Sequence, residues 1–530
     1  MTRWAMVADI DRCVGCQTCT AACRHANATS PAVEWRRVLD IEAGAYPNVS
    51  RTFVPVGCQH CAEAPCTDVC PSRATWRRGD GIVVMDYDLC IGCAYCEVAC
   101  PYQARFKIDA QNFAYGGGAM RNEKQREDPR RFGVAQKCTF CSDRIDFGLA
   151  NGLIPGIDPA ATPACVNACI ADALHFGDAD DPTSNVARLL REQKHFRMHE
   201  ALGTKPGFYY VHGRADSGDE PAASSAVVEP ATAGQIRSRG VEPAHQAHWD
   251  WKAAANFMCG GAGAGLVAFA AAASLFGATA WQAMLAGAAL VALGLFFVLL
   301  KIGRPLRAAN VLRQPQRSWM AREAWVAMAF FPLAALALWS PRTSFVVIAG
   351  AFALAFLACQ AMILFGAKGI PAWREPLTVS LIVATGLAEG GGLLLAAFAL
   401  APVAFPVAAA AAIAVLVLAA ARGVVWRLYV RSLETKGAPS RTLEVFDGMR
   451  IWIHSLGLAL PAALILVGFI PMIEPALPFA LGGLVAFAAG WLLKFILVTR
   501  AAYNQGFALD HIPRGRGMAG QSVKPGWSLP

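Results

Sequence analysis

The stretch DLCIGCAYCEVACPYQARF, residues 88–106, spaces four cysteines by two, two and three residues and puts a proline directly after the last one. Residues 11–27, DRCVGCQTCTAACRHAN, repeat this spacing without the proline. Two other groups vary the pattern: one inserts two residues before its third cysteine, and the other separates its two halves by 23 residues. Sixteen of the eighteen cysteines fall in these four groups, so we expect this half of the chain to fold around them.

The spacing in residues 88–106 is typical of bacterial ferredoxins, in which three thiolates bind one [4Fe-4S] cluster and the fourth binds its neighbour. Structural zinc uses well-separated C-x2-C pairs, which gives no reason for the third and fourth cysteines and the proline. Disulfides fit neither the crowded C-x2-C pairs nor a reducing compartment. The sequence therefore predicts four [4Fe-4S] clusters.

The composition divides the chain into a soluble half and a membrane half. The 530 residues are 55% hydrophobic, and the mean hydropathy is +0.38. The first 250 residues are rich in Cys, Asp, Arg and Pro, whereas residues 253–500 are successive runs of Ala, Leu, Val, Phe and Gly. We expect a cluster domain over 1–215, a flexible Ala/Pro/Ser/Gly-rich linker over 216–249, a membrane domain over 250–505 and a cytoplasmic tail over 506–530. No apolar export signal precedes the first cysteine, so we expect the cluster domain to stay in the cytoplasm.

The four cysteine groups, with HCAEAPCTDVCP and KCTFCSDRI…TPACVNACIADAL beside the two stretches above, resemble the four-cluster electron-transfer subunit of the dimethyl sulfoxide reductase superfamily of molybdenum and tungsten enzymes. The resemblance covers residues 5–212 and implies an α+β domain of two ferredoxin-like folds. It also implies that each cluster takes three cysteines from one group and the last from a paired group. The four implied ligand sets are Cys13, Cys16, Cys19 and Cys169; Cys138, Cys141, Cys165 and Cys23; Cys58, Cys61, Cys66 and Cys100; and Cys90, Cys93, Cys96 and Cys70.

The second half reads as an all-α polytopic membrane domain of about eight helices. Its connections alternate in charge: 301–323, 368–376, 422–450 and the tail from 500 hold eighteen Lys and Arg residues, whereas the opposite connections hold Arg342 alone. Cytoplasmic loops carry this excess of cations. We therefore expect a multi-pass protein of the cytoplasmic membrane, with its cluster domain on the cytoplasmic side.

The membrane half resembles the anchor subunit of the same superfamily, through GRPLRAANVLRQPQRSWMARE and AAYNQGFALDHIPRGRGMAGQSVKPGW. The resemblance implies exchange of electrons with the quinone pool. Haem-bearing anchors need pairs of axial ligands, commonly histidine, and His454 is the one histidine inside a predicted span. We expect no haem, so quinone would react directly with the nearest cluster.

Polar residues within the spans are costly and often functional. His454, Lys494 and Asn256 belong to the cytoplasmic leaflet, Glu389 lies near mid-membrane, and Arg304 belongs to the family-like GRPLR segment. These five are the candidates for a quinone or proton site. The alternatives are a helix-capping role for His454, an extended Lys494 whose ammonium reaches the membrane surface, and an ion pair or hydrogen bond for Glu389.

These features predict a non-catalytic electron-transfer and anchor subunit that works with a molybdenum or tungsten pterin subunit, the quinone pool and membrane lipid, and not with nucleic acid. A cytoplasmic dehydrogenase of the sulfite or phenylacetyl-CoA type is the first interpretation. A quinol-using reductase of a sulfur compound or of an S- or N-oxide is the second. A hydrogenase-linked or proton-translocating quinone module is the third; it requires a polar path across the spans, and Glu389 alone supports it.

Overall fold

The computed structural model describes residues 2–31, 33–45, 48–110, 113–115, 117–126, 128–212, 236–239, 242–278, 281–401 and 403–507. They form two compact units: residues up to Ala244 together with the segment from Gln505, here called the cysteine unit, and His245–Asn504, here called the helical unit. Most of the expected linker, and the expected tail beyond Phe507, lie outside the described residues.

The main sheet of the cysteine unit has the strand order β8-β1-β10-β9. β1 pairs in parallel with β10 and antiparallel with β8. All six residues of β1 are buried, as the apolar run WAMVA suggests. Helix α7 begins after Ser184, whose hydroxyl accepts a hydrogen bond from the Ala187 amide, and it packs its apolar face on the sheet. The strands are β1 (Trp4–Asp9), β8 (Leu174–Asp178), β9 (Lys194–Phe196) and β10 (Phe208–His212), and the helix is α7 (Asn185–Glu192).

Three small sheets complete the strands of this unit. A long hairpin of β2 (Arg36–Ala45) and β3 (Asn48–Gly57) is joined by β11 (Ile236–Arg239), a strand formed within the stretch that we expected to be a linker. The other two are short antiparallel pairs: β4 (Thr75–Arg77) with β5 (Val83–Met85), and β6 (Phe106–Lys107) with β7 (Ala135–Gln136).

Short helices carry the cysteines. Several start directly after a residue in the left-handed region, such as Gln17 before α1, Ala94 before α3 and Cys141 before α5. This turn lets the preceding loop fold back over the helix start. The expected α+β ferredoxin-like class is confirmed for this unit. Its helices are α1 (Thr18–Asn27), α2 (Pro65–Asp68), α3 (Tyr95–Val98), α4 (Arg121–Arg126), α5 (Ser142–Ala150) and α6 (Ala164–Asn167), with 3-10 turns at Pro129–Arg131 and Glu200–Leu202.

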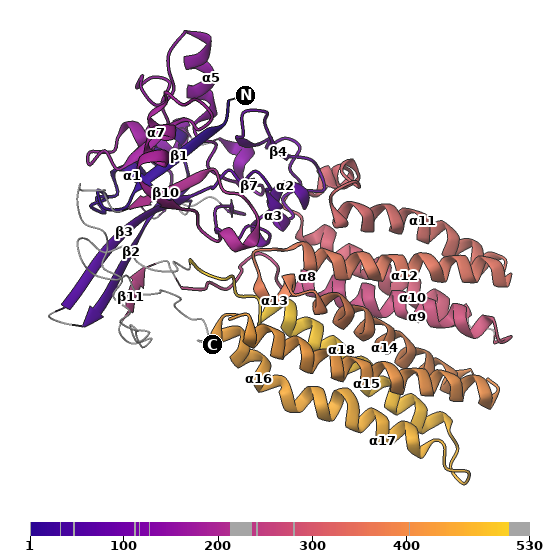
Figure 1. Cartoon of the computed structure of the whole chain (residues 1–530). Helices are drawn as coiled ribbons and strands as arrows, with labels where there is room; N and C mark the ends of the chain where they lie inside the picture. Colours follow the sequence, from indigo (N-terminus) through magenta and orange to yellow (C-terminus); the bar gives the residue numbers. More distant parts are fainter. Residues whose placement is uncertain are drawn as a thin grey trace. The chain divides into compact units, whose positions relative to one another are not determined.

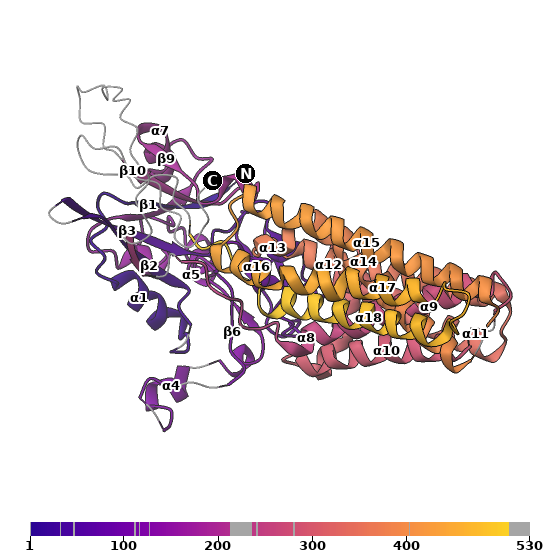
Figure 2. The same cartoon turned by 90° about the horizontal axis from the view of Figure 1, so that it is seen from below.

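The helical unit contains eight stretches long and apolar enough to cross a membrane, which confirms the predicted helical domain. Figures 1 and 2 show its long helices side by side as one bundle. In chain order they are α8 (Trp251–Ala255) continuing through a π-helix (Asn256–Gly260) into α9 (Gly261–Ser274), α10 (Trp281–Lys301), α11 (Trp319–Trp339), α12 (Thr343–Gly366), α14 (Leu377–Leu400), α15 (Phe405–Thr435), α16 (Ser440–His454) continuing through a π-helix (Ser455–Ala459) into α17 (Leu460–Val467), and α18 (Ala476–Thr499). A 3-10 helix (Pro305–Arg313) and α13 (Pro371–Arg374) lie in connections.

One boundary differs from the expectation. We expected residues 422–450 to be a connection, but α15 runs to Thr435 and α16 starts at Ser440, so most of these cations stand on helices. The segment contains good helix formers until Gly437, whose φ of 66° ends the helix, and Pro439 starts the next one.

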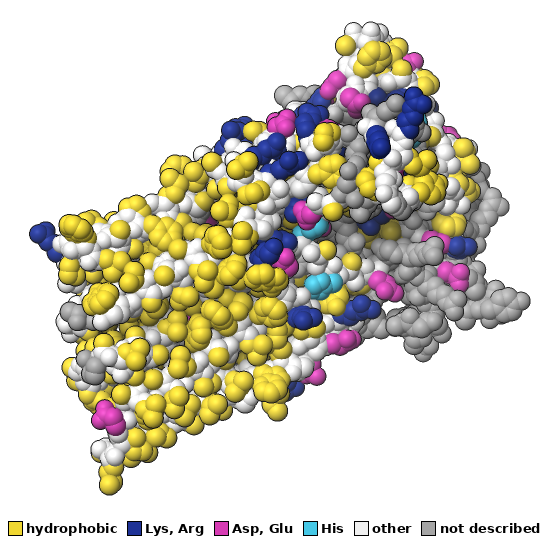
Figure 3. All heavy atoms as spheres, turned by 180° about the vertical axis from the view of Figure 1, so that it is seen from behind, with side chains coloured by type: hydrophobic (Ala, Val, Ile, Leu, Met, Phe, Trp, Pro, Cys, Tyr) yellow, Lys and Arg dark blue, Asp and Glu magenta, His cyan; other side chains and the backbone are white. Residues whose placement is uncertain are grey.

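Glycines set how closely the helices pack. A Cβ built on Gly265 would lie 2.1 Å from the Gly386 carbonyl oxygen, so α9 and α14 meet backbone to backbone. Gly261, four residues earlier, instead faces the Lys494 ammonium nitrogen, 2.2 Å from the Cβ position. On the face of the bundle that Figure 3 shows, the coloured side chains between the ends of the helices are mostly hydrophobic, as expected for a surface that faces lipid.

Candidate functional site

The four predicted cysteine sets each come together in the cysteine unit. Cys13, Cys16, Cys19 and Cys169 line one cavity. A second cavity is lined by Cys58, Cys61, Cys66 and Cys100. In each case one cysteine comes from a sequence group remote from the other three.

The remaining two sets are identified by their electrostatic neighbours. The Cys90, Cys93 and Cys96 thiols all interact with Cys70. The thiol of Cys23 interacts with Cys138, Cys165 and Cys141. Asn27 joins the two parts of this set, because its Nδ2 lies 3.6 Å from Cys23 Sγ and 3.7 Å from Cys141 Sγ.

The donors of these sets fit iron-sulfur clusters. Backbone amides donate to the sulfurs, from Gly92 to Cys90 at 3.4 Å, from Phe140 to Cys138 at 3.4 Å and from Ala173 to Cys169 at 3.2 Å. Such hydrogen bonds help to set cluster potentials. Within the described ranges, no three Cys, His, Asp or Glu side chains converge closely enough to bind a single metal ion.

Burial makes many of these thiols poor acids before iron is bound, Cys19 and Cys93 among them, whereas hydrogen bonding with Thr18 lowers the pKa of the exposed Cys16. Burial raises the pKa of Cys19 to about 11 and the pKa of Cys93 to about 12. Desolvation disfavours the thiolate, and the neighbouring thiols add to the effect. Iron would supply the missing positive charge, so cluster assembly in these sets should release protons.

Among the buried cations beside the sets, three lie between neighbouring sets, and they were not identified from the sequence: Arg36, Lys137 and Arg105 are 1%, 0% and 3% exposed. The strongest electrostatic neighbours of Arg36 are Cys165, Cys138, Cys19 and Cys23. Arg36 therefore stands between the first set and the set of Cys138.

Lys137 and Arg105 likewise lie between neighbouring cysteine sets. The Lys137 ammonium donates to the carbonyls of Val83 and Cys138, and Cys58 is its strongest cysteine neighbour. Arg105 Nη2 donates to Cys66 Sγ at 3.0 Å and to Thr75 Oγ1 at 2.8 Å.

Cys96 is the next cysteine neighbour of Arg105 after Cys66. Each cation thus borders two sets, which places the sets in a row: first that of Cys13, then that of Cys138, that of Cys58 and that of Cys90. The sequence could have indicated the role of Lys137, because this residue directly precedes Cys138. Arg36 gave no such signal, since it follows Cys23 by 13 residues.

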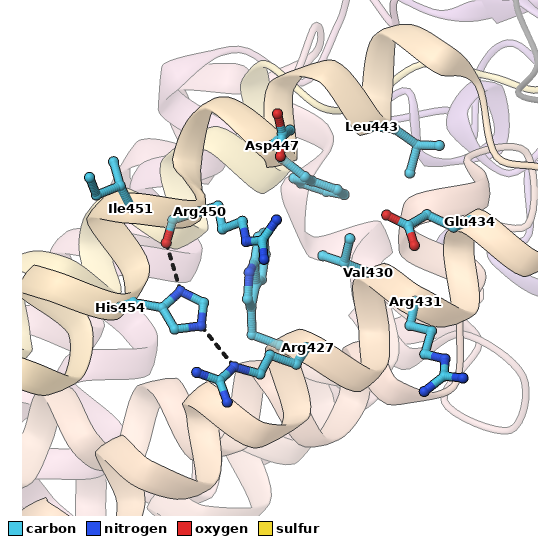
Figure 4. Close-up of a pocket in the computed structure, with 11 residues that line it drawn as sticks. Arg427, Val430, Arg431, Glu434, Leu443, Asp447, Arg450, Ile451 and His454 are labelled. Carbon is cyan, nitrogen blue, oxygen red and sulfur yellow. Dashed lines mark hydrogen bonds between the residues drawn. The ribbon is translucent and has the colours of Figure 1, made fainter.

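In the helical unit, His454 lines a cavity of about 800 Å³ between α15 and α16. Figure 4 shows His454 between Arg450 on its own helix and Arg427 on the facing one. Arg427 Nε donates to His454 Nε2 at 2.8 Å, so the ring proton is on Nδ1, which donates to the Arg450 carbonyl at 2.7 Å. The other lining residues are Trp426, Val430, Arg431, Glu434, Leu443, Phe446, Asp447 and Ile451.

The five candidate membrane residues do not form one site. Lys494 and Glu389 form an ion pair at 2.5 Å, both with fully buried side chains, so Lys494 does not extend to the surface. Asn256 is also buried, beside Gln360. Arg304 directly precedes the 3-10 helix and is not among the residues lining the His454 cavity. Glu323 and Gln360, which we did not single out in the sequence, are buried polar residues on α11 and α12.

Comparison with known proteins gives consistent matches. Residues 49–116 match the family model described as a 4Fe-4S dicluster domain. A selenate reductase subunit of Mesobacillus selenatarsenatis is 39% identical over 39% of this chain and 72% of its own length. A putative dimethyl sulfoxide reductase iron-sulfur subunit of Halobacterium salinarum is 38% identical over 41% of this chain and 82% of its length. A sulfite dehydrogenase subunit of Allochromatium vinosum is 36% identical over 40% of this chain and 85% of its length.

Proposed function

This chain belongs to the family of iron-sulfur subunits of molybdopterin oxidoreductases, and on that premise we propose that it carries electrons between a separate molybdenum or tungsten pterin subunit and the quinone pool. The observation that carries the proposal is the row of four cysteine sets in a chain that also contains eight apolar spanning helices. The row supplies the route for electrons, and the helices supply access to a lipid-soluble acceptor.

The residues of each set hold and shield a redox centre. Four [4Fe-4S] clusters bound there would each pass one electron at a time. The thiols supply four ligands per set, and the amides of Gly92, Phe140 and Ala173 donate to the ligand sulfurs. Eleven of the sixteen ligand cysteines are buried, which limits the access of water. Because each cluster passes one electron at a time, the row divides a two-electron substrate reaction into single-electron steps. Quinone can take up the electrons one by one.

The charges of the helical unit support a cytoplasmic orientation of the cysteine unit. The connections 302–318, 367–376 and 436–439 carry Arg304, Arg307, Arg313, Arg317, Lys368, Arg374 and Lys436. Those on the opposite side, around 275–280, 340–342, 401–404 and 468–475, have Arg342 as their one Lys or Arg residue. Positive residues stay on the cytoplasmic side of a bacterial membrane.

The His454 cavity is the proposed quinone site. Trp426, Phe446 and Ile451 give it apolar walls, and His454 and Arg427 place polar nitrogens at its edge. A quinone needs both, because its ring is apolar and its carbonyl oxygens accept hydrogen bonds. His454 lies at the end of α16, and Arg427, Arg431 and Arg450 line the same cavity.

Replacing His454 by Ala should slow the reoxidation of chemically reduced clusters by added quinone at least about tenfold, since a positioned acid or base contributes about that much or more. Stopped-flow absorbance of the clusters measures this step. The matched control is His195→Ala, at an exposed histidine of β9, which should react at the wild-type rate. Equal rates for His454→Ala and wild type would remove His454 from the site.

We propose that electrons run from the catalytic subunit to quinone, in a dehydrogenase of the sulfite or phenylacetyl-CoA type. The similarity to a sulfite dehydrogenase subunit supports this direction. The similarity to a selenate reductase subunit favours the second candidate, a quinol-using reductase. Purification of the native complex decides between them: sulfite or an acyl-CoA should reduce its clusters in the first case, and quinol should reduce them in the second.

Arg105 is proposed to raise the potentials of the two centres beside it. At an effective dielectric constant of about 20, a unit charge roughly 6 Å away contributes about 3 kcal/mol. Since about 1.4 kcal/mol corresponds to roughly 59 mV for one electron, Arg105→Gln should lower the midpoint potentials of these centres by on the order of 100 mV. Potentiometric titration followed by electron paramagnetic resonance (EPR) measures the shift. Arg105→Lys, which keeps the charge, and Arg188→Gln on the exposed face of α7 should change little; unshifted potentials in Arg105→Gln would contradict the role.

A further inference from the structure

Five polar side chains meet inside the helical unit, away from the His454 cavity. They are Glu323 of α11, Asn256 of the first π-helix, Gln360 of α12, Glu389 of α14 and Lys494 of α18, and none is more than 4% exposed. Five helical segments thus each turn one polar group inward, in a bundle whose other inward residues are mostly Ala, Gly and Leu.

Direct contacts join these side chains into two halves. Lys494 Nζ donates to Glu389 Oε2 at 2.5 Å. Gln360 Nε2 donates to the Asn256 carbonyl oxygen at 3.0 Å, and the side chains of Asn256 and Gln360 hydrogen-bond to the Glu323 carboxyl group.

The two halves meet at a pair of glycines. A Cβ on Gly260 would lie 2.4 Å from Gln360 Nε2. A Cβ on Gly261 would lie 2.2 Å from Lys494 Nζ and 3.4 Å from Gln360 Oε1. The Gln360 amide oxygen and the Lys494 ammonium therefore both face the backbone of residue 261, which has no side chain. A water molecule between them would join the two halves of the network.

Four acceptor oxygens of this network have no donor among the described residues: Asn256 Oδ1, Gln360 Oε1, Glu323 Oε1 and Glu389 Oε1. An unpaired buried acceptor costs about 1–3 kcal/mol. Protons on the carboxyl groups or enclosed water molecules would remove this cost. The network therefore needs protons that the described protein donors do not supply.

Glu323 differs from Glu389 in having amide partners and no paired cation among the described residues. Its neighbour Arg322 donates to the carbonyls of Pro315 and Gln316 instead. The other titratable group facing Glu323 is the Cys359 thiol. A buried carboxyl group without a cation is most stable in its neutral form.

The Glu389–Lys494 half of the network also has titratable neighbours. Arg422 and the Cys259 thiol face the Glu389–Lys494 pair. Arg422 Nη2 donates to the Gly457 carbonyl oxygen at 2.6 Å, within the second π-helix. Asn256 thus belongs to one π-helix, and Arg422 contacts a second one, and π-helical turns occur frequently at functional sites.

We propose that Glu323, Asn256, Gln360, Lys494 and Glu389 form a proton relay from the shallow membrane to its middle. Glu323 lies four residues after the start of α11 and Glu389 twelve after the start of α14, depths of about 6 and 18 Å. Protonated Glu323 gives its proton to the water held by Gln360, that water gives one to Lys494 as the ammonium gives one to Glu389, and Glu323 regains a proton from outside. One proton moves inward and no bond other than those to hydrogen changes.

The relay is independent of the clusters and of the quinone site, so its test uses neither. The full chain in lipid nanodiscs is followed by infrared spectroscopy, in which a protonated buried carboxyl group gives its own carbonyl band. The wild type should show this band, and Glu323→Gln should lose one carboxyl equivalent of it. The control Glu474→Gln, in the connection before α18, should keep the band.

The transfer itself is tested by exchange into deuterated water. The Lys494 ammonium lies beyond Gln360 on the proposed path, and its N–H vibrations are identified by their loss in Lys494→Met. These vibrations should exchange within the mixing time in the wild type, and Gln360→Leu should slow this exchange at least tenfold by removing the amide that holds the water. Normal melting of each variant shows that the fold is intact. A band that survives Glu323→Gln, or an exchange rate that Gln360→Leu leaves unchanged, would mean a static polar network and overturn the proposal.

Discussion

Replacing Cys169 by Ala should remove the same cluster that Cys16→Ala removes, although residue 169 lies 153 positions further along the chain. The two thiols line one cavity with Cys13 and Cys19. The wild-type protein, purified without oxygen, should contain roughly sixteen iron atoms, four per set, and each variant roughly twelve. Electron transfer through the row should fall by orders of magnitude, because one step in the series is lost.

EPR distinguishes this result from the simpler assignment, in which Cys169 binds the same cluster as the other cysteines of its sequence group, Cys138, Cys141 and Cys165. The signal lost in Cys169→Ala should match that lost in Cys16→Ala and differ from that lost in Cys138→Ala. The control Cys359→Ala, in the helical unit, should retain all the iron. Loss of the same signal in Cys169→Ala and Cys138→Ala would contradict the shared cavity, and a zinc-rich protein without iron would contradict the clusters altogether.

Replacing Lys494 by Met should destabilise the helical unit by about 3–5 kcal/mol, which is the cost of removing one partner of a buried ion pair. Glu389, whose side chain is 0% exposed, would then keep its carboxyl group in the bundle without its ammonium partner. The midpoint of unfolding in a mixed-micelle denaturant titration measures the loss.

The double variant Glu389→Leu with Lys494→Met separates charge from packing. Replacing a whole buried pair by apolar side chains of similar size is often neutral or stabilising. We therefore expect the double variant to recover most of the stability that Lys494→Met loses. The surface control Lys205→Met removes an ammonium that pairs with Glu63, with side chains 62% and 65% exposed, and should cost less than about 1 kcal/mol. A double variant as unstable as the single one would mean that Lys494 acts through its packing.

The local features of the chain were readable in advance because they depend on residues close in sequence. A C-x2-C-x2-C run places three ligands within one loop and one helical turn. Cys90, Cys93 and Cys96 could therefore be predicted as cluster ligands without any tertiary information. The eight spans could also be predicted from the sequence, since about 20 apolar residues cross a bilayer as a helix. The helical 422–450 segment was misread because charge marks the membrane boundary but not the end of a helix.

The contacts of the candidate membrane residues could not be predicted from the sequence. Lys494 and Glu389 are 105 residues apart, and neither sequence environment indicates that they pair. Glu323 was assigned to a basic boundary stretch, yet α11 turns it inward toward Asn256 and Gln360. Which face of an apolar helix turns inward depends on its neighbours, because a helix that is hydrophobic all round carries no amphipathic stripe.

By itself, therefore, the sequence determined the ligand type, the ferredoxin-like class, the number of spans and the distribution of positive charge. Only the tertiary structure decided the order of the cysteine sets, the three cations buried between them and the polar network at Gly260 and Gly261. The physical reason is the range of the interactions: spacing and hydropathy act over a few residues. The contacts of Arg36, Arg105 and Lys494 join positions that become neighbours only after the chain has folded.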